Sequence, residues 1–296
     1  MTTTPIRAVT WNLYLGGLDN GSEFRLSAQT EILARLRPDV LALQECTHWD
    51  DQDERRLLTL AGALGMAPVT MARSNVGDGR NFTALLYRPA TLRLIKRRTL
   101  GAEVFHHALI RARLRPVAAV DDSSDFLAFA THLTHTDGET RLREARWLTD
   151  YAGQFPGMPP RAMLLGDLNC SGVHDKDPED WGLIPQNLHS RYRLVNDDGS
   201  FGGMDRRAMR ALLNSGWTDP QALTGEPRDA TVGFKWENEP VPLSLDHILI
   251  HGLGATSYRT HDTPEARAVS DHLPVVLDLD PVARAEPLFE AAIQTT

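Results

Sequence analysis

Several short apolar runs of this chain end in a polar or ionisable side chain. In the stretch LLGDLNCSG, the apolar run that begins at Leu164 is followed at once by Asp167 and Asn169. An unpartnered polar group is costly to bury, so side chains in such places need partners or a ligand. If the ends of these runs meet in the folded chain, they form one cleft lined by carboxylates and amides.

The same pattern recurs elsewhere along the chain. Polar side chains stand at or near an end of an apolar run at Asn12, Glu45, His132, Asp246, Asp271 and His272. An oxygen-rich set with few thiols suits a hard cation, so the expected cofactor is Mg²⁺ or Mn²⁺. Side chains two apart share one face of a strand, so Asp167 and Asn169 are expected to act together: one on an attacking water, the other as a donor to a phosphoryl oxygen.

Hydrophobic patterning predicts more strands than helices. Strands are expected at residues 6–11, 39–44, 81–89, 91–100, 107–120, 125–133, 161–167, 242–252 and 274–280. Helices are expected at residues 23–36, 53–64, 138–155 and 204–214, and residues 175–200 are expected to be irregular. Helices interrupt only some of the strands, which favours an α/β protein of α+β type, with antiparallel or mixed sheets packed face to face and helices outside.

Composition limits the classes of function. The net charge is −8, which argues against binding duplex DNA by overall charge but leaves room for a local basic cleft. Two cysteines indicate neither a disulfide framework nor a zinc site. No apolar run is long enough to span a membrane, and the polar start MTTTPIRAVTWN does not resemble a secretory signal. We therefore expect a cytoplasmic monomer.

Six sequence blocks carry a resemblance to a known family. TWNLYLGG, LALQE, ATHLTHT, LLGDLN, SLDHILI and VSDHLPV occur in this order and together resemble the signature blocks of the endonuclease/exonuclease/phosphatase superfamily. The blocks span residues 6–280, so residues 1–296 are expected to form one domain with short polar tails. The resemblance implies a four-layer sandwich of two mixed β-sheets with helices on both outer sides, and metal-dependent hydrolysis of a phosphoester.

The resemblance also implies which residues lie beside the metal ion. Glu45 matches the principal ligand, Asn12 lies near it, and Asp271 is a second carboxylate on the metal side.

The remaining matched positions imply catalytic roles. His132 contacts the scissile phosphate, Asn169 holds it, and Asp167 orients or deprotonates the attacking water. Asp246 orients His272, so either Asp167 or the His272–Asp246 pair can act as the base.

Arginines on one predicted strand offer a further binding surface. Alternation places Arg111, Arg113 and Arg115 on a common face, where Arg111 and Arg113 are candidates for binding the substrate phosphate. The alternative is that this face is an outer, solvated surface of the sheet.

Three further residues directly follow predicted site residues in the sequence. Alternation points His247 away from Asp246, so His247 is left out. Cys46 and Cys170 directly follow predicted site residues; buried, inert thiols are the favoured interpretation and a redox switch is the alternative. Seven histidines are treated as surface or structural residues: His48, His106, His107, His174, His189, His251 and His261.

The leading functional hypothesis is a divalent-metal-dependent phosphodiester hydrolase, specifically a nuclease acting on DNA or RNA. The first alternative is a phosphoesterase for a small molecule or lipid headgroup, and the second is a catalytically silent binding module. The longest irregular segment, residues 175–203, is acidic, with Trp181, Tyr192 and Phe201 as candidate stacking groups. Such a segment is a poor track for duplex DNA.

Overall fold

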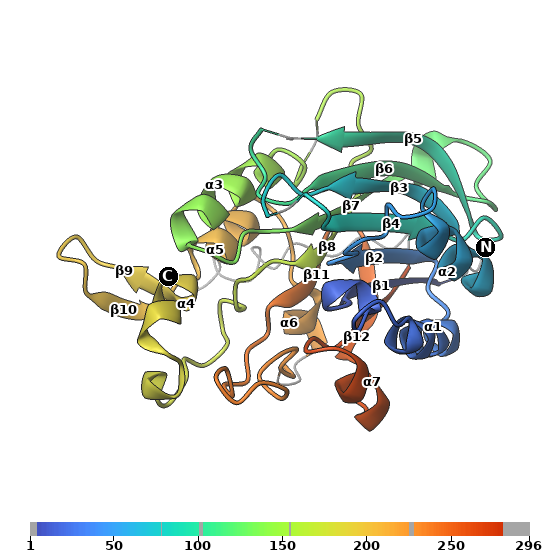
Figure 1. Cartoon of the computed structure of the whole chain (residues 1–296). Helices are drawn as coiled ribbons and strands as arrows, with labels where there is room; N and C mark the ends of the chain where they lie inside the picture. The colour runs from blue at the N-terminus through green and yellow to red at the C-terminus, as the bar shows by residue number, and fades with distance from the viewer. Residues whose placement is uncertain (1–4, 78, 101–102, 154, 225–227, 281–296) are drawn as a thin grey trace, which may run out of the picture.

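Two large β-sheets pack face to face in the computed structural model, which describes residues 5–77, 79–100, 103–153, 155–224 and 228–280 (Figure 1). The spatial order of the first sheet is β12 (Gly254–Thr260), β13 (Val275–Asp280), β1 (Ile6–Asn12), β2 (Val40–Gln44), β4 (Phe82–Tyr87) and β3 (Ala67–Arg73). That of the second is β11 (Asp246–His251), β8 (Ala162–Asp167), β7 (Phe126–His132), β6 (Leu109–Pro116) and β5 (Leu92–Leu100). The pairs β1–β2 and β7–β8 are parallel and their neighbours antiparallel, so both sheets are mixed, as predicted.

The inner core lies between the two sheets. Successive side chains of a strand point to opposite faces, so alternate positions of both sheets meet in the middle. Ala42 and Leu85 from one sheet and Ala128, Leu165 and Ile248 from the other belong to this fully buried cluster. Burial of both inner faces stabilises the face-to-face arrangement.

Helices cover the two outer faces and complete four layers. The helices α1 (Phe24–Leu36), α2 (Arg55–Leu64) and α7 (Pro264–Val269) pack on the first sheet. On the second sheet lie α3 (Gly138–Thr149) and α5 (Arg207–Asn214). Within the described residues, no helix is long and apolar enough to cross a bilayer.

The edges of the first sheet and one long connection differ from the sequence prediction. β3 and β12 were not predicted, because as edge strands they are only partly buried and lack a clear apolar pattern. Residues 175–203 were expected to be irregular but contain α4 (His189–Tyr192), β9 (Arg193–Val195) and the start of β10 (Phe201–Met204). A further short helix, α6 (Pro220–Thr224), precedes β11.

One end of the sandwich gathers the polar ends of the inner strands. β1 and β2 finish together, with Asn12 opposite Gln44. β7 and β8 also finish together, with His132 opposite Asp167, and antiparallel β11 begins at Asp246 opposite the same Asp167. The topology therefore explains why residues far apart in sequence come together.

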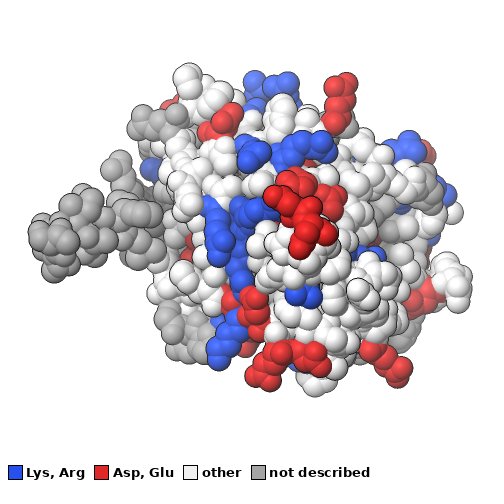
Figure 2. Space-filling view, turned by 90° about the vertical axis from the view of Figure 1, so that its left-hand side faces the viewer, with Lys and Arg blue, Asp and Glu red and all other residues white. Residues whose placement is uncertain are grey.

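The surface beside this end is of mixed charge. On the face that carries α4, β9 and β10, Lys and Arg side chains form a short band with clusters of Asp and Glu beside and below it (Figure 2). The described residues of this face therefore form no continuous basic track.

Candidate active site

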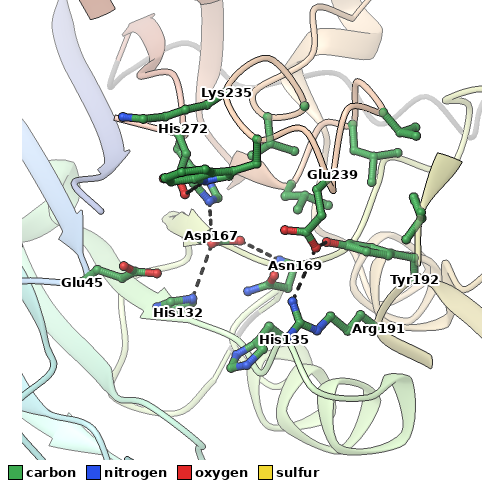
Figure 3. A pocket seen from close by; sticks show the side chains of 18 residues that line it. Glu45, His132, His135, Asp167, Asn169, Arg191, Tyr192, Lys235, Glu239 and His272 are labelled. Atoms are coloured by element: carbon green, nitrogen blue, oxygen red, sulfur yellow. Dashed lines mark hydrogen bonds and ion pairs between the residues drawn. The ribbon is translucent and has the colours of Figure 1, made fainter. Parts of the chain in front are cut away.

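A cavity of about 200 Å³ opens at the polar end of the sandwich, and we call it the strand-end cavity (Figure 3). It is lined by six of the residues predicted from the sequence: Glu45, His132, Asp167, Asn169, Asp271 and His272. Asn12 and Asp246 are buried directly behind it and hydrogen bond to lining residues. The structure thus brings together all the residues predicted for the metal and catalytic sites, but not the two arginines predicted for substrate binding.

Asn12 links two carboxylates at one end of the cavity. Its side-chain Nδ2 donates to Glu45 Oε1 at 3.3 Å and to Asp167 Oδ2 at 3.1 Å. The other Glu45 oxygen accepts from the backbone N–H of Leu15 at 3.1 Å. Burial raises the pKa of Glu45, and the nearby Asp271 carboxylate raises it further. A cation here would relieve the repulsion between these carboxylates.

Asp271 supplies an unused oxygen. Its Oδ2 accepts from Trp236 Nε1 at 2.9 Å, whereas its buried Oδ1 has no hydrogen-bond partner among the described residues. A buried orphan carboxylate oxygen beside a second carboxylate fits a hard divalent cation, which prefers oxygen ligands. Glu45 and Asp271 therefore have the chemistry to hold Mg²⁺ or Mn²⁺.

A second acidic cluster suits a proton network better than a metal. Ligand atoms of Asp167, Asp246 and His272 all lie within 4.8 Å of one another. His272 Nδ1 lies 2.8 Å from Asp246 Oδ2, and its Nε2 lies 3.8 Å from Asp167 Oδ2. Burial alone lowers the pKa of His272, but the two carboxylates outweigh it and hold that pKa well above its ordinary value. A protonated imidazole carries hydrogen on both nitrogens and cannot ligate a metal.

His132 lies on the opposite side of Asp167. Its Nε2 is 3.4 Å from Asp167 Oδ2, and its ring stacks on His107 with centroids 4.0 Å apart. His107 Nδ1 is in turn hydrogen bonded to Ser74 Oγ at 2.9 Å. Burial lowers the pKa of His132 well below its ordinary value, and neighbouring histidines add to the effect. Burial therefore disfavours a proton on His132, whereas the two carboxylates favour one on His272.

Asp167 and Asn169 reach the cavity by a different route from the one predicted. β8 ends at Asp167, and Asn169 lies beyond the strand in the left-handed region with φ 48°. Both side chains line the cavity, but the alternation of side chains along a strand does not explain why. The Asn169 backbone N–H donates to Asp167 Oδ1 at 2.9 Å, and Asn169 Nδ2 donates to the Leu133 carbonyl at 3.0 Å. Gly166 is required before this turn, because a Cβ there would lie 2.1 Å from the Thr131 carbonyl oxygen.

Sequence reasoning missed five polar or aromatic residues that line the cavity: His135, Arg191, Lys235, Trp236 and Glu239. His135 had a signal, since it stands three residues after His132 in the block ATHLTHT. Of the candidate stacking groups only Tyr192 lines the cavity, whereas the rings of Trp181 and Phe201 flank the Arg193 guanidinium.

The two candidate substrate-binding arginines lie elsewhere. Arg111 is buried, with its guanidinium 5.5 Å from the Tyr151 ring centre, and Arg113 pairs with Asp125 and Asp122. Neither lines the strand-end cavity, so their interpretation as part of a phosphate-binding groove finds no support in this site.

The residues set aside from the sequence also lie outside the cavity. His247 is fully buried, with Nε2 2.8 Å from the Cys170 carbonyl oxygen. Cys46 and Cys170 are buried free thiols, and burial raises the pKa of both. Protonated, inaccessible thiols favour the inert interpretation over a redox switch.

This sandwich, with carboxylates and imidazoles gathered at its strand ends, defines the class as a phosphoester hydrolase. The sequence profile of the Endonuclease/Exonuclease/phosphatase family matches residues 9–272. The chain belongs to this family, as its six sequence blocks predicted. A search of curated proteins gives no match.

Solved structures with the same fold cover nearly the whole chain. An endonuclease/exonuclease/phosphatase from Bacteroides vulgatus superposes with a TM-score of 0.66 at 16% identity, covering 94% of this chain and 99% of that one. The human Nocturnin catalytic domain with bound sulfate gives 0.59 at 19% identity, covering 93% and 94%. A Bacteroides thetaiotaomicron mannosyl-6-phosphatase gives 0.62 at 16% identity, covering 93% and 99%. At these identities the likeness establishes the fold.

Proposed function

We propose that this protein is a divalent-metal-dependent hydrolase of small phosphoesters, in which the phosphate enters the strand-end cavity as a terminal group. The observation that carries this proposal is the shape of the cavity, which has an apolar wall on one side. This revises the leading expectation of a nuclease in favour of its first alternative.

The apolar wall comes from two segments that pack on each other. Ile184 and Met204 contribute from the connection after β8, and Val241, Leu243 and Leu245 contribute from the segment before β11. Four of these five residues also line the cavity. Apolar side chains beside a few convergent polar groups are typical of a site for a small molecule.

Charge also supports a small substrate. The chain carries a net charge of −8, and the face beside the cavity alternates basic and acidic clusters (Figure 2). Binding of long nucleic acids depends on neutralising many phosphates. The fold is also used by a protein described as a mannosyl-6-phosphatase.

Glu45 and Asp271 are the proposed holders of the metal ion, with Asn12 fixing Glu45. A divalent cation bound there would neutralise the negative charge that develops on the phosphoryl and leaving-group oxygens. The unpartnered Asp271 Oδ1, whose carboxylate is close enough to raise the pKa of Glu45, supports this placement of the ion.

The other residues have proposed roles around the phosphate. His272, protonated between Asp246 and Asp167, donates a hydrogen bond to the developing charge, as do neutral His132 and Asn169. Asp167 is the proposed group that orients and deprotonates the attacking water, because its Oδ2 stands between the two imidazoles, 3.4 Å from His132 Nε2 and 3.8 Å from His272 Nε2. Asp246 then acts by holding the orientation and charge of His272.

The test compares substrates of different size. p-Nitrophenyl phosphate, bis-p-nitrophenyl phosphate, single-stranded oligonucleotides and plasmid DNA are each incubated with Mg²⁺, Mn²⁺ or EDTA. The proposal predicts EDTA-sensitive turnover of the small esters with little cutting of internal phosphodiester bonds. Efficient cutting of plasmid or oligonucleotide would restore the nuclease hypothesis, and inactivity with every substrate and metal would favour the silent module.

A further inference from the structure

The strand-end cavity has two chemically different ends (Figure 3). Glu45 and His272 lie toward one end, and Arg191, Tyr192 and Glu239 lie together at the other, beyond Asn169. The first end holds the residues proposed for metal binding and hydrolysis. The second end, which we call the distal cluster, has no role in that chemistry.

The distal cluster is held in place from behind. Arg191 and Tyr192 are the last residues of the short helix α4, and the Arg191 carbonyl accepts from Arg141 Nη2 at 2.8 Å. Arg141 is buried and also donates to the Thr134 carbonyl at 3.2 Å. Thr134 lies two residues after His132, so one buried guanidinium ties the distal cluster to the segment that carries the catalytic histidine.

The polar atoms of the distal cluster are only partly used. Glu239 Oε1 accepts from the Tyr192 hydroxyl at 3.0 Å and lies 3.5 Å from Arg191 Nη1. Both contacts fall on the same oxygen, and the described residues give Glu239 Oε2 and Arg191 Nη2 no hydrogen-bond partner. An acceptor beside a donor matches a hydroxyl group, which both donates and accepts.

Charge in the distal cluster argues against a second phosphate. The Arg191 and Glu239 charges offset each other, and a phosphate that reached Arg191 would also meet the Glu239 carboxylate. A neutral hydroxyl group would not be repelled by the Glu239 carboxylate. The cluster therefore favours a neutral, hydrogen-bonding part of the substrate.

An aromatic ring lines the cavity beside the metal end. Trp236 is fixed by its bond to Asp271 at 2.9 Å and by contact with the Tyr14 ring at 5.5 Å between centroids. Its side chain is half-exposed and lines the cavity together with Leu243. A fixed, amphipathic ring near a few convergent polar groups is typical of small-molecule sites.

We propose that the distal cluster binds the hydroxyl groups of a sugar ring whose phosphate lies at the metal end, so that the substrates are sugar phosphates. This inference rests on the proposed function and names its substrate class. Glu239 and Arg191 bind adjacent hydroxyls, and Trp236 offers an apolar surface to the ring carbons. Small sugar phosphates are the favoured source of this chemistry, with the terminal ribose of an oligoribonucleotide as the competing one.

The test separates sugar recognition from hydrolysis. Wild-type protein is assayed with hexose 6-phosphates, ribose 5-phosphate, its 2-deoxy analogue and p-nitrophenyl phosphate, which lacks sugar hydroxyls. Glu239→Gln keeps the shape of the side chain and Arg191→Lys keeps its charge. Each is expected to raise KM for the sugar phosphates about 10-fold or more, with kcat/KM for p-nitrophenyl phosphate within about twofold of wild type. Glu237→Gln, on the same segment but exposed and outside the cavity, is the matched control and is expected to change neither.

The outcomes distinguish the two proposals. The sugar subsite would be overturned if Glu239→Gln and Arg191→Lys lost activity equally on the sugar phosphates and on p-nitrophenyl phosphate, or lost activity on neither. In that case, EDTA-sensitive turnover of p-nitrophenyl phosphate by the wild-type protein would still uphold the proposed hydrolase. A preference for oligoribonucleotide ends over free sugar phosphates would overturn the choice of a small sugar phosphate. Absence of EDTA-sensitive turnover on every ester would overturn the proposed function and the subsite with it.

Discussion

Asn12→Ala tests the link between the two carboxylates of the strand-end cavity. Asn12 is buried, and its side-chain amide donates to Glu45 at 3.3 Å and to Asp167 at 3.1 Å. A hydrogen bond to a charged group contributes about 1.5–3 kcal/mol, and both distances are long. We therefore expect the free energy of unfolding without metal to fall by about 3 kcal/mol in total.

The same substitution should weaken metal binding. Residues that orient a metal ligand typically account for about 10–100-fold in affinity, so the Mn²⁺ concentration for half-maximal activity should rise by that factor. Urea denaturation and a Mn²⁺ titration of turnover measure the two effects. The control is Thr10→Val, on the same strand as Asn12. It removes a buried hydrogen bond to Gln44 of the neighbouring strand β2 but should leave the Mn²⁺ dependence unchanged. An Asn12→Ala protein with wild-type stability and wild-type Mn²⁺ dependence would refute the reasoning.

Two further predictions concern catalysis and pH. Asp167→Asn and His272→Ala should each lower kcat on a small phosphoester by roughly 10²-fold or more while the protein stays folded by circular dichroism; near-wild-type turnover in either would contradict the assigned roles. Burial raises the pKa of Asp125, but the hydrogen bonds from Arg115 and Arg113 outweigh this effect and hold the pKa below its ordinary value. The ionised Asp125 carboxylate therefore stabilises the fold fully above about pH 4–5, and this stabilisation is lost as the pH falls through the lowered pKa. Asp125→Asn should therefore cost about 2–3 kcal/mol at pH 7 and progressively less toward pH 3 in urea unfolding; a cost that does not change with pH would contradict this.

The sequence predicts the inner strands and the residues at their ends well. The inner strands are buried on both faces, so their sequences are nearly continuous apolar runs; these strands are β1, β2, β7 and β8. A polar residue at the end of such a run is therefore easy to recognise in the sequence. The order of the six blocks then identified the family. Edge strands such as β12 lack that signal because much of their surface is exposed.

The far wall of the cavity could not be predicted from local pattern. Arg191 and Glu239 come from short segments with no periodic signal. The segments that carry them contribute Ile184 and Val241 to one apolar cluster, and this packing helps to bring the two charged side chains together. Alternation alone also could not tell which face Arg111 occupies, and the structure places its guanidinium against Tyr151. Such positions depend on tertiary packing, which single-sequence periodicity does not contain.

The central claim is that Glu45 and Asp271 share a divalent cation, and Mn²⁺ binding measured by calorimetry tests it most directly. We expect EDTA-reversible Mn²⁺ binding in the wild-type protein, a loss of affinity of about 10-fold or more in Glu45→Gln and Asp271→Asn, and retained binding in Asp246→Asn. Undiminished affinity in Glu45→Gln together with lost binding in Asp246→Asn would place the ion in the other cluster and contradict the account.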